Sequence, residues 1–227
     1  MHAPVPVGDT ALAWLGAWLG GGLVATTIIV LSGSDGDGPY WLVLSALLSW
    51  VPLLGVTFAL SRRYTGSWPS LHPRRGDLRL VDLLGLPAGV VAQFVLVPAV
   101  YWPLRAVWPD AFDPTDIERR ARDLWNSASG VGTVLVVLVV VVGAPIVEEL
   151  VYRGLLQRSL GHRFGRWSAL VIASAWFAAV HLQPVEFPGL FVAGLVFGVG
   201  LAITGRVGAG VMAHVGFNIS GLMLVAL

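Results

Sequence analysis

The chain has 227 residues, of which 56% are hydrophobic and only 12% are charged, and its formal net charge is +1. A soluble domain usually carries about twice that share of charged residues, so the composition excludes an ordinary soluble protein and gives no sign of a nucleic-acid partner. Because there is no cysteine, disulfides and thiolate chemistry are excluded as well.

Long apolar runs recur along the chain and predict membrane-spanning helices, each of which needs about 20 apolar residues. Seven candidate spans cover residues 11–31, 40–60, 81–104, 130–152, 167–183, 187–204 and 207–227. We therefore expect an all-α protein, a polytopic membrane helix bundle with about seven transmembrane helices. Residues 1–227 would form a single integral membrane domain, and no cleaved signal peptide is expected, because no basic stretch precedes the first span.

The arginines are unevenly distributed between the two sides of this predicted bundle. All fourteen basic residues are Arg. The loops 61–80 and 153–166 would lie on one side together with Arg206 and the N-terminus, and that side holds ten of the fourteen. The positive-inside rule then predicts a multi-pass protein of the cell membrane with a cytoplasmic N-terminus. The length and the Arg-only composition look bacterial.

The one long loop on the other side, residues 105–129, predicts a short amphipathic helix at about 115–128. Thr115 and Glu118 have the spacing of a capping box. Such a helix would anchor the loop at the membrane surface, or it would act as a lid over a substrate entrance. Elsewhere, the pairs Gly16/Gly20, Gly85/Gly89 and Gly194/Gly198 have the spacing of close helix–helix contacts.

Ionisable residues cluster at the predicted spans of the second half of the chain. The stretch from Ser129 to Val147 contains no ionisable residue, and Glu148 and Glu149 follow it directly. Pro145 would kink the span or start a new helical segment just before them. The two acids differ by about 100° around a helix, whereas Glu149 and Arg153 share a face and can form an ion pair. Alternatively, both acids only cap a helix at the membrane surface.

Two further pairs lie four residues apart, Phe177 with His181 and His214 with Asn218. Each pair alone would be a packing contact. Together with Glu148, however, three predicted helices supply a carboxylate, two imidazoles and an amide, a set that can polarise a water molecule and bind a developing negative charge. Glu186 follows as a loop-end charge or as part of the rim of such a site.

In their order and spacing, Glu148, Glu149 and Arg153, then Phe177 and His181, then His214 and Asn218 resemble the three motifs of the CPBP family of intramembrane proteases. This family includes the CAAX-prenyl proteases and proteins linked to bacteriocin processing. The resemblance covers about residues 140–222. It implies a helix bundle around a polar cavity and hydrolysis of a peptide bond of a membrane-associated peptide or protein.

The resemblance also implies roles for the motif residues. Glu148 with His181 would activate the attacking water, and His214 with Asn218 would bind the oxyanion. Glu149, Arg153 and Phe177 would support the site. Glu148, His181 and His214 would also be adequate ligands for one divalent metal, zinc being an option, but the HExxH pattern is absent. We lean toward water activation without a cofactor. The alternatives are a catalytically inactive membrane scaffold and a proton-coupled transporter of the same fold.

Overall fold

A computed structural model describes residues 4–66 and 79–227, except for the side chains of residues 114–118. Within these residues the chain is helical throughout and contains no strand, so the predicted all-α class is confirmed. Six helical stretches are long and apolar enough to cross a membrane. Many large apolar side chains on them are exposed, as expected of a surface that contacts lipid.

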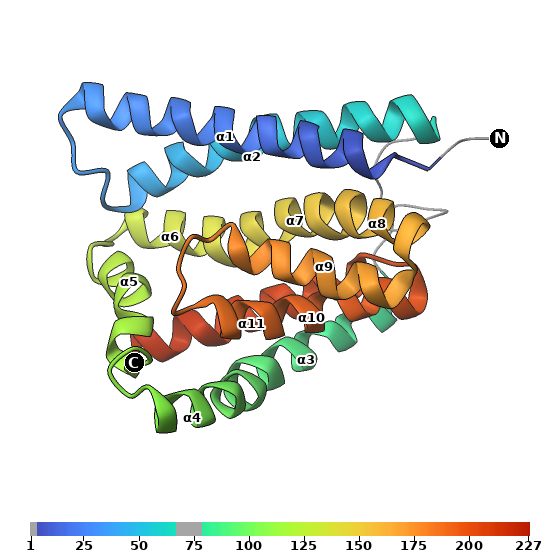
Figure 1. Cartoon of the computed structure of the whole chain (residues 1–227). Helices are drawn as coiled ribbons and strands as arrows, with labels where there is room; N and C mark the ends of the chain where they lie inside the picture. Colours follow the sequence, from blue (N-terminus) through green and yellow to red (C-terminus); the bar gives the residue numbers. More distant parts are fainter. Residues whose placement is uncertain (1–3, 67–78) are drawn as a thin grey trace.

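The first two helices form an antiparallel hairpin along one side of the bundle (Figure 1). Helix α1 runs from Val7 to Ser32 and α2 from Pro39 to Thr65. Gly33 ends α1 in the left-handed conformation, with φ of 69°, which glycine adopts without steric cost. Of the glycines in α1, Gly21 contacts α2, because a Cβ there would lie 2.7 Å from the carbonyl oxygen of Leu48.

The third span is built from four consecutive helical segments. These are η1 (Leu80–Leu84), α3 (Gly85–Val91), the π-helix η2 (Ala92–Leu96) and α4 (Val97–Val107). Its first half packs closely on α11 (Gly208–Ala226), because a Cβ at Gly85 or Gly89 would collide with the α11 backbone. At the start of the span, Asp82 forms a buried ion pair with Arg206.

The fourth span is one continuous rod of 34 residues, from Val131 to Phe164. It comprises α6 (Val131–Val137), the π-helix η3 (Leu138–Gly143), α7 (Ala144–Glu148), the π-helix η4 (Glu149–Gln157) and α8 (Arg158–Phe164). The predicted end of this span at residue 152 was wrong, since the helix continues until Gly165. No proline stands between residue 152 and Gly165, and the charge of Arg153 is neutralised within the helix by Glu149.

Three helices complete the bundle: α5 (Pro114–Asn126), α9 (Arg166–Ala179) and α10 (Phe187–Thr204). Helix α9 corresponds to the fifth predicted span, residues 167–183, but its 14 residues reach only roughly 21 Å against a hydrocarbon core of roughly 30 Å. The count of about seven therefore agrees with six long helices and one short one. Helix α5 confirms the short helix predicted in the long loop; its predicted capping box lies outside the described side chains.

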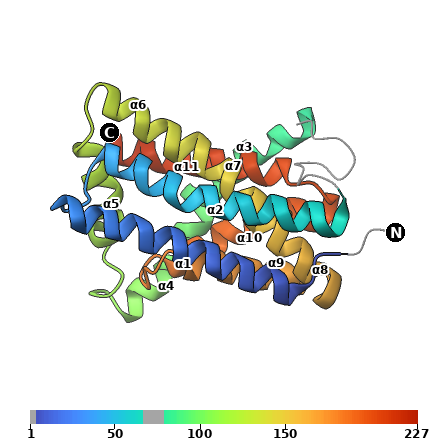
Figure 2. The same cartoon turned by 90° about the horizontal axis from the view of Figure 1, so that it is seen from above.

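The arrangement of the ends agrees with the predicted topology. Figure 1 shows α2 ending, α8 ending and α9 beginning at one end of the bundle, the same end at which α1 begins. Helix α11 ends at the opposite end, near α5 and α6 (Figures 1 and 2). Which end faces the cytoplasm stays a prediction.

The glycine pairs separate into two groups. Gly85/Gly89 make the predicted close helix contacts, and so does Gly194, which lies against Ser174. For Gly16/Gly20 the prediction was wrong, because no atom of the described residues lies within 4 Å of a Cβ placed at either position. Spacing alone does not tell which face of α1 meets α2, and the contact falls one residue later, at Gly21.

Candidate active site

The first motif lies at the junction of α7 and the π-helix η4. Glu149 is completely buried, and its Oε1 is 3.0 Å from Nη1 of Arg153, so the predicted ion pair forms. Nη2 of Arg153 donates to the carbonyl oxygen of Gly194 at 2.9 Å. The guanidinium also lies over the rings of Phe177 and Phe197, at 4.8 and 5.5 Å from their centroids. Arg153 thereby connects η4 to α10 and α9.

One turn further along η4, the same connection is repeated. Gln157 donates through Nε2 to the carbonyl oxygen of Gly198 at 3.0 Å. Arg153 and Gln157 are four residues apart on η4, and their acceptors Gly194 and Gly198 are four apart on α10. Because these acceptors have no side chain, a long polar side chain can reach the α10 backbone. The glycine spacing on α10 therefore serves polar contacts as well as packing.

Glu148 points in a different direction from its neighbour. Its side chain keeps 23% of its surface exposed, whereas that of Glu149 is at 0%. Glu148 lines a cavity of about 150 Å³ on the side of the rod that faces α2 and the end of α9. The two adjacent glutamates thus lie in different environments: Glu149 is buried beside a cation, and Glu148 lines the cavity. The angle of about 100° between successive residues of a helix predicts this difference.

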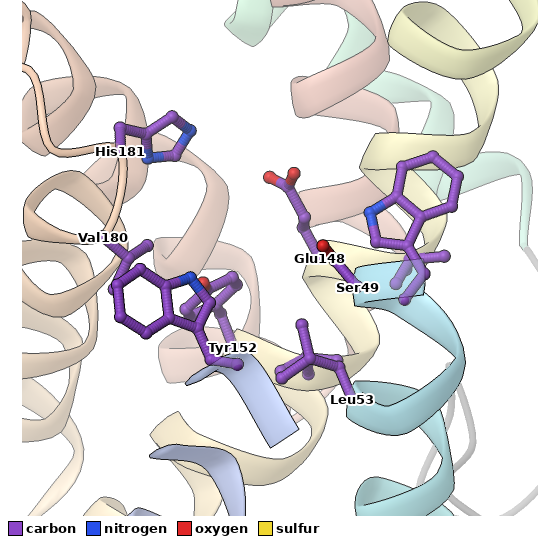
Figure 3. A pocket seen from close by; sticks show the side chains of 10 residues that line it. Ser49, Leu53, Glu148, Tyr152, Val180 and His181 are labelled. Atoms are coloured by element: carbon purple, nitrogen blue, oxygen red, sulfur yellow. The ribbon is translucent and has the colours of Figure 1, made fainter. Parts of the chain in front are cut away.

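His181 lies across this cavity from Glu148 (Figure 3). Helix α9 ends at Ala179, so the carbonyl oxygens of its last turn lack the usual helical donors. Nδ1 of His181 is 2.7 Å from one of them, the carbonyl oxygen of Phe177. A carbonyl can only accept, so Nδ1 carries the proton and Nε2 is the acceptor of the neutral ring. The four-residue spacing of Phe177 and His181 is what allows this bond.

The remaining wall of the cavity is mostly aromatic and aliphatic. Figure 3 shows Tyr152, Leu53 and Val180 around the space between the two polar groups. The full lining is Trp18, Ser49, Trp50, Leu53, Val147, Glu148, Val151, Tyr152, Val180 and His181. The volume is enough for several water molecules, and Glu148, Ser49 and His181 give such waters polar partners.

His214, on α11, lies between the two glutamates. Its Nδ1 is 3.2 Å from Oε1 of Glu149, and its Nε2 is 4.0 Å from Oε2 of Glu148. The ring is buried and stacks on Phe197, with centroids 4.3 Å apart and planes at 15°. A proton on Nδ1 is donated to the buried carboxylate of Glu149, so Nε2 is the ring atom turned toward Glu148.

Asn218 has a different partner from the other three predicted catalytic residues. Its Nδ2 donates to the carbonyl oxygen of Val140 at 2.7 Å. At the end of the π-helix η3 the N–H of Ala144 donates to the carbonyl oxygen of Val139, five residues earlier. By the same spacing, the carbonyl oxygen of Val140 would accept from the N–H of residue 145. That residue is Pro145, which has no N–H. The side chain of Asn218 therefore supplies the donor that the proline lacks, and Asn218 is not among the residues that line the 150 Å³ cavity.

The structure thus brings Glu148 and His181 to one cavity and His214 next to Glu148, while the amide nitrogen of Asn218 is bound to the backbone. Within residues 4–66 and 79–227, no group of three His, Cys, Asp or Glu side chains is arranged to hold a metal ion. Arg153 moreover already occupies Oε1 of Glu149, which His214 shares. Metal binding by Glu148, His181 and His214 stays a prediction, and we derive no step through a metal.

A second and larger cavity, of about 760 Å³, adjoins the first, since His181 lines both. Residues of the α1–α2 turn, α2, the third span, α5, α10 and α11 enclose it. Ala121 and Leu124 of α5 contribute apolar lining, and Arg120 of α5 forms an ion pair with Glu186 at 3.5 Å. Helix α5 therefore lies at the boundary of the cavity, and Glu186 is part of its lining. Whether α5 acts as a lid stays a prediction.

Several residues of these cavities escaped the sequence analysis. Tyr152 follows Glu148 by four residues, and this spacing predicts a common helix face. Gln93 lines the larger cavity from the π-helix η2; a lone amide within an apolar run is the signal that could have identified it. The buried ion pair of Asp82 and Arg206 could not be predicted from local spacing, because 124 residues separate the two.

One comparison with known proteins gives a match. Residues 130–220 match the Rce1-like family model, described as type II CAAX prenyl endopeptidase Rce1-like. The matched region contains Glu148, Glu149, Arg153 and the two later motifs, so the resemblance drawn from those motifs is confirmed. No match was found among curated proteins or among solved structures.

Proposed function

We propose that this protein is an intramembrane endopeptidase of the CAAX protease type, which hydrolyses a peptide bond of a membrane-associated peptide or protein. The observation that carries the proposal is the cavity at which the carboxylate of Glu148 and the imidazole of His181 face each other. The match of residues 130–220 to a family of endopeptidases supports the same reaction class.

In the proposed reaction, a water molecule sits between Glu148 and His181. Nε2 of His181 accepts a hydrogen bond from one O–H and orients the water, since Nδ1 is held by Phe177. Glu148 removes the other proton as the water oxygen attacks the carbonyl carbon of the substrate. The C–N bond then breaks, and Glu148 returns the proton to the leaving amine. The products are a carboxylic acid and an amine, and Glu148 is again ionised.

The oxygen of the attacked carbonyl becomes negatively charged and needs a hydrogen-bond donor. We assign this role to Nε2 of His214, which would donate to the oxyanion through its N–H; Nδ1 of the same ring lies 3.2 Å from Oε1 of Glu149, and Nε2 lies 4.0 Å from Oε2 of Glu148. Glu149 and Arg153 hold the ring in place. Asn218 would have to leave the carbonyl of Val140 to join in; in the resting protein it supports the helix segment that carries Glu148.

We assign the larger cavity to the substrate, because it shares His181 with the cavity of the proposed reaction. Its lining mixes apolar residues such as Trp41 and Leu42 with polar ones such as Ser45 and Gln93. An extended peptide presents polar backbone amides together with side chains of varied polarity. A lining of polar and apolar residues can accommodate the amides and the side chains. Gln93 is placed to hydrogen-bond such a backbone.

The test is the substitution Glu148→Gln, which keeps the size of the side chain and removes the base. We expect cleavage to fall by at least about 100-fold, the lower range for the loss of a general base. Membrane peptides from cells producing wild-type or variant protein would be compared by mass spectrometry, and a cleaved peptide would then be assayed with the purified protein in vesicles.

The matched control is Asp110→Asn, the same change in charge on an exposed turn. It should cleave at the wild-type rate. If the Glu148→Gln protein is folded and cleaves as fast as wild type, the proposal is refuted. A different result would identify a transporter: neither wild type nor the variant cleaves any peptide, and wild type carries a proton flux into vesicles that is lost in Glu148→Gln.

A further inference from the structure

A third cavity, unconnected with the proposed reaction, lies at the end of the bundle where α8 ends, α9 begins and α10 ends. Its volume is about 320 Å³, and its lining includes Arg158, His162 and Arg166. We propose that this cavity binds the phosphate group of an anionic phospholipid.

The charge of the cavity is positive and unbalanced. None of its lining residues is acidic. Within the described parts of the chain, no ion pair is formed by Arg158, His162 or Arg166, whereas the nearby Arg206 is neutralised by Asp82. Cations gathered without a counter-charge raise the local potential and attract an anion. A basic pocket between membrane helices at the headgroup level is a typical site for an anionic lipid.

Arg158 has donors to spare for such a ligand. One of its nitrogens, Nη2, donates to the carbonyl oxygen of Gly205 at 3.2 Å, which anchors the side chain against the end of α10. Its Nε is buried and has no hydrogen-bond partner among the residues that the structure describes. A guanidinium has five N–H groups in a planar fork that matches two oxygens of a phosphate, so a phosphate oxygen would satisfy donors that the protein leaves open.

Helix α9 contributes a second attraction. It begins at Arg166, directly after Gly165, whose φ of 82° turns the chain sharply between α8 and α9. The first amides of a helix lack intrahelical partners, and the helix dipole favours negative charge at this end. Arg166 and the N-terminus of α9 therefore act in the same direction on an anion in the cavity.

The surroundings favour a lipid over a free phosphate ion. The rod that carries Arg158 has 34 residues, roughly 50 Å, so it extends beyond a hydrocarbon core of roughly 30 Å. Phe164 and Trp167 are about half exposed at this end, and Ile203, near Gly205, is 64% exposed. Aromatic residues of this kind are typical of the membrane interface, and apolar side chains next to the cavity offer contacts for acyl chains.

The experiment measures lipid binding by the purified full-length protein in neutral detergent by native mass spectrometry. The probes are phosphatidylglycerol, phosphatidylcholine and inorganic phosphate. We expect wild type to prefer phosphatidylglycerol, and Arg158→Gln combined with Arg166→Gln to weaken its binding by about tenfold or more, because each arginine near an anionic headgroup adds to the attraction. Arg163→Gln is the matched control, since Arg163 lies on the same helix but not in the cavity, and it should bind like wild type.

The pair Arg158→Lys and Arg166→Lys keeps both charges but not the planar fork of the guanidinium, so its binding should lie between that of wild type and that of the glutamine variant, which separates charge from folding. Loss of binding in this variant would overturn the proposal, and so would undiminished binding by the glutamine variant or equal binding of the two lipids by wild type. Displacement of phosphatidylglycerol by inorganic phosphate at equal concentration would assign the cavity to free phosphate and refute the lipid.

Discussion

Two sides of one helix turn show how this protein handles charge inside a membrane. On one side, which we call the anchor, Glu149 and Arg153 are fully buried and bonded to each other and to the backbone of α10. On the other side, the cavity face, Glu148 keeps part of its surface exposed opposite His181. The chemistry of the two carboxylates is identical, so only their surroundings distinguish the buried, paired acid from the proposed general base.

Of these two adjacent glutamates, Glu149 is neutralised by Arg153, and Glu148 is left accessible at the cavity. A buried charge is tolerated best when it is paired and hydrogen-bonded. In the anchor, Oε1 of Glu149 lies 3.0 Å from Arg153 and 3.2 Å from His214, whereas Oε2 has no hydrogen-bond partner among the described residues. The cavity face leaves its carboxylate unpaired at short range, which is costly in an apolar setting. His214 contacts both glutamates, so its contact with the buried Glu149 holds the ring in position next to Glu148.

The largest effect is expected from Arg153→Met, which removes the cation of the anchor. Glu149 would then be a buried charge without its counter-ion, and we expect the free energy of unfolding to fall by about 3–5 kcal/mol. Unfolding would be measured by titration from mild detergent into dodecyl sulfate. Arg163→Met, an exposed arginine on the continuation of the same rod, should change this free energy by less than about 0.5 kcal/mol.

Removing both charges by Glu149→Leu together with Arg153→Met should recover much of that loss, because an apolar pair of similar volume avoids the desolvation penalty. If the double variant is less stable than Arg153→Met alone, Glu149 stabilises the fold mainly through His214, and the ion pair is secondary.

A smaller effect is expected at Asn218, which connects α11 to the segment before Glu148. Asn218→Leu removes the donor to the carbonyl of Val140, and Pro145 cannot replace it. The unsatisfied carbonyl should lower the free energy of unfolding by about 1–3 kcal/mol. Measuring cleavage on the same variant separates two roles: a loss of rate at saturating substrate that exceeds the change in stability would indicate that Asn218 also contacts the reacting groups.

The smallest change in stability is expected at the cavity face. Glu148→Gln keeps the shape of the side chain and removes a partly exposed charge whose ion-pair partner, Nε2 of His214, is 4.0 Å away, so the free energy of unfolding should stay within about 0.5 kcal/mol of wild type. The same titration, run on the variant used for the cleavage assay, provides the measurement. A loss as large as that of Arg153→Met would mean that both acids are structural and that the two sides do not differ.

Local patterns predicted much of this site. The four-residue spacing of Glu149 and Arg153 implied their ion pair, and adjacency implied that Glu148 points elsewhere, since both follow from helix geometry alone. The end of the rod at Phe164 was missed, because Arg153 and Arg158 interrupt the apolar run and therefore suggested a loop. In the structure Arg153 is neutralised by Glu149, and Arg158 donates to the carbonyl oxygen of Gly205. The partner of Asn218 was missed because a π-helix is not visible as a pattern of residue types.

The helical membrane bundle and the residues of its three motifs follow from the order of amino acids alone, because apolar run length and helical spacing are properties of neighbours along the chain. Only the tertiary structure decided that His214 lies between two glutamates, that Asn218 serves the carbonyl left open by Pro145, and that His181 joins two cavities. These facts depend on which faces of separate helices meet, and that choice is made by packing and by the pairing of buried polar groups across the whole bundle.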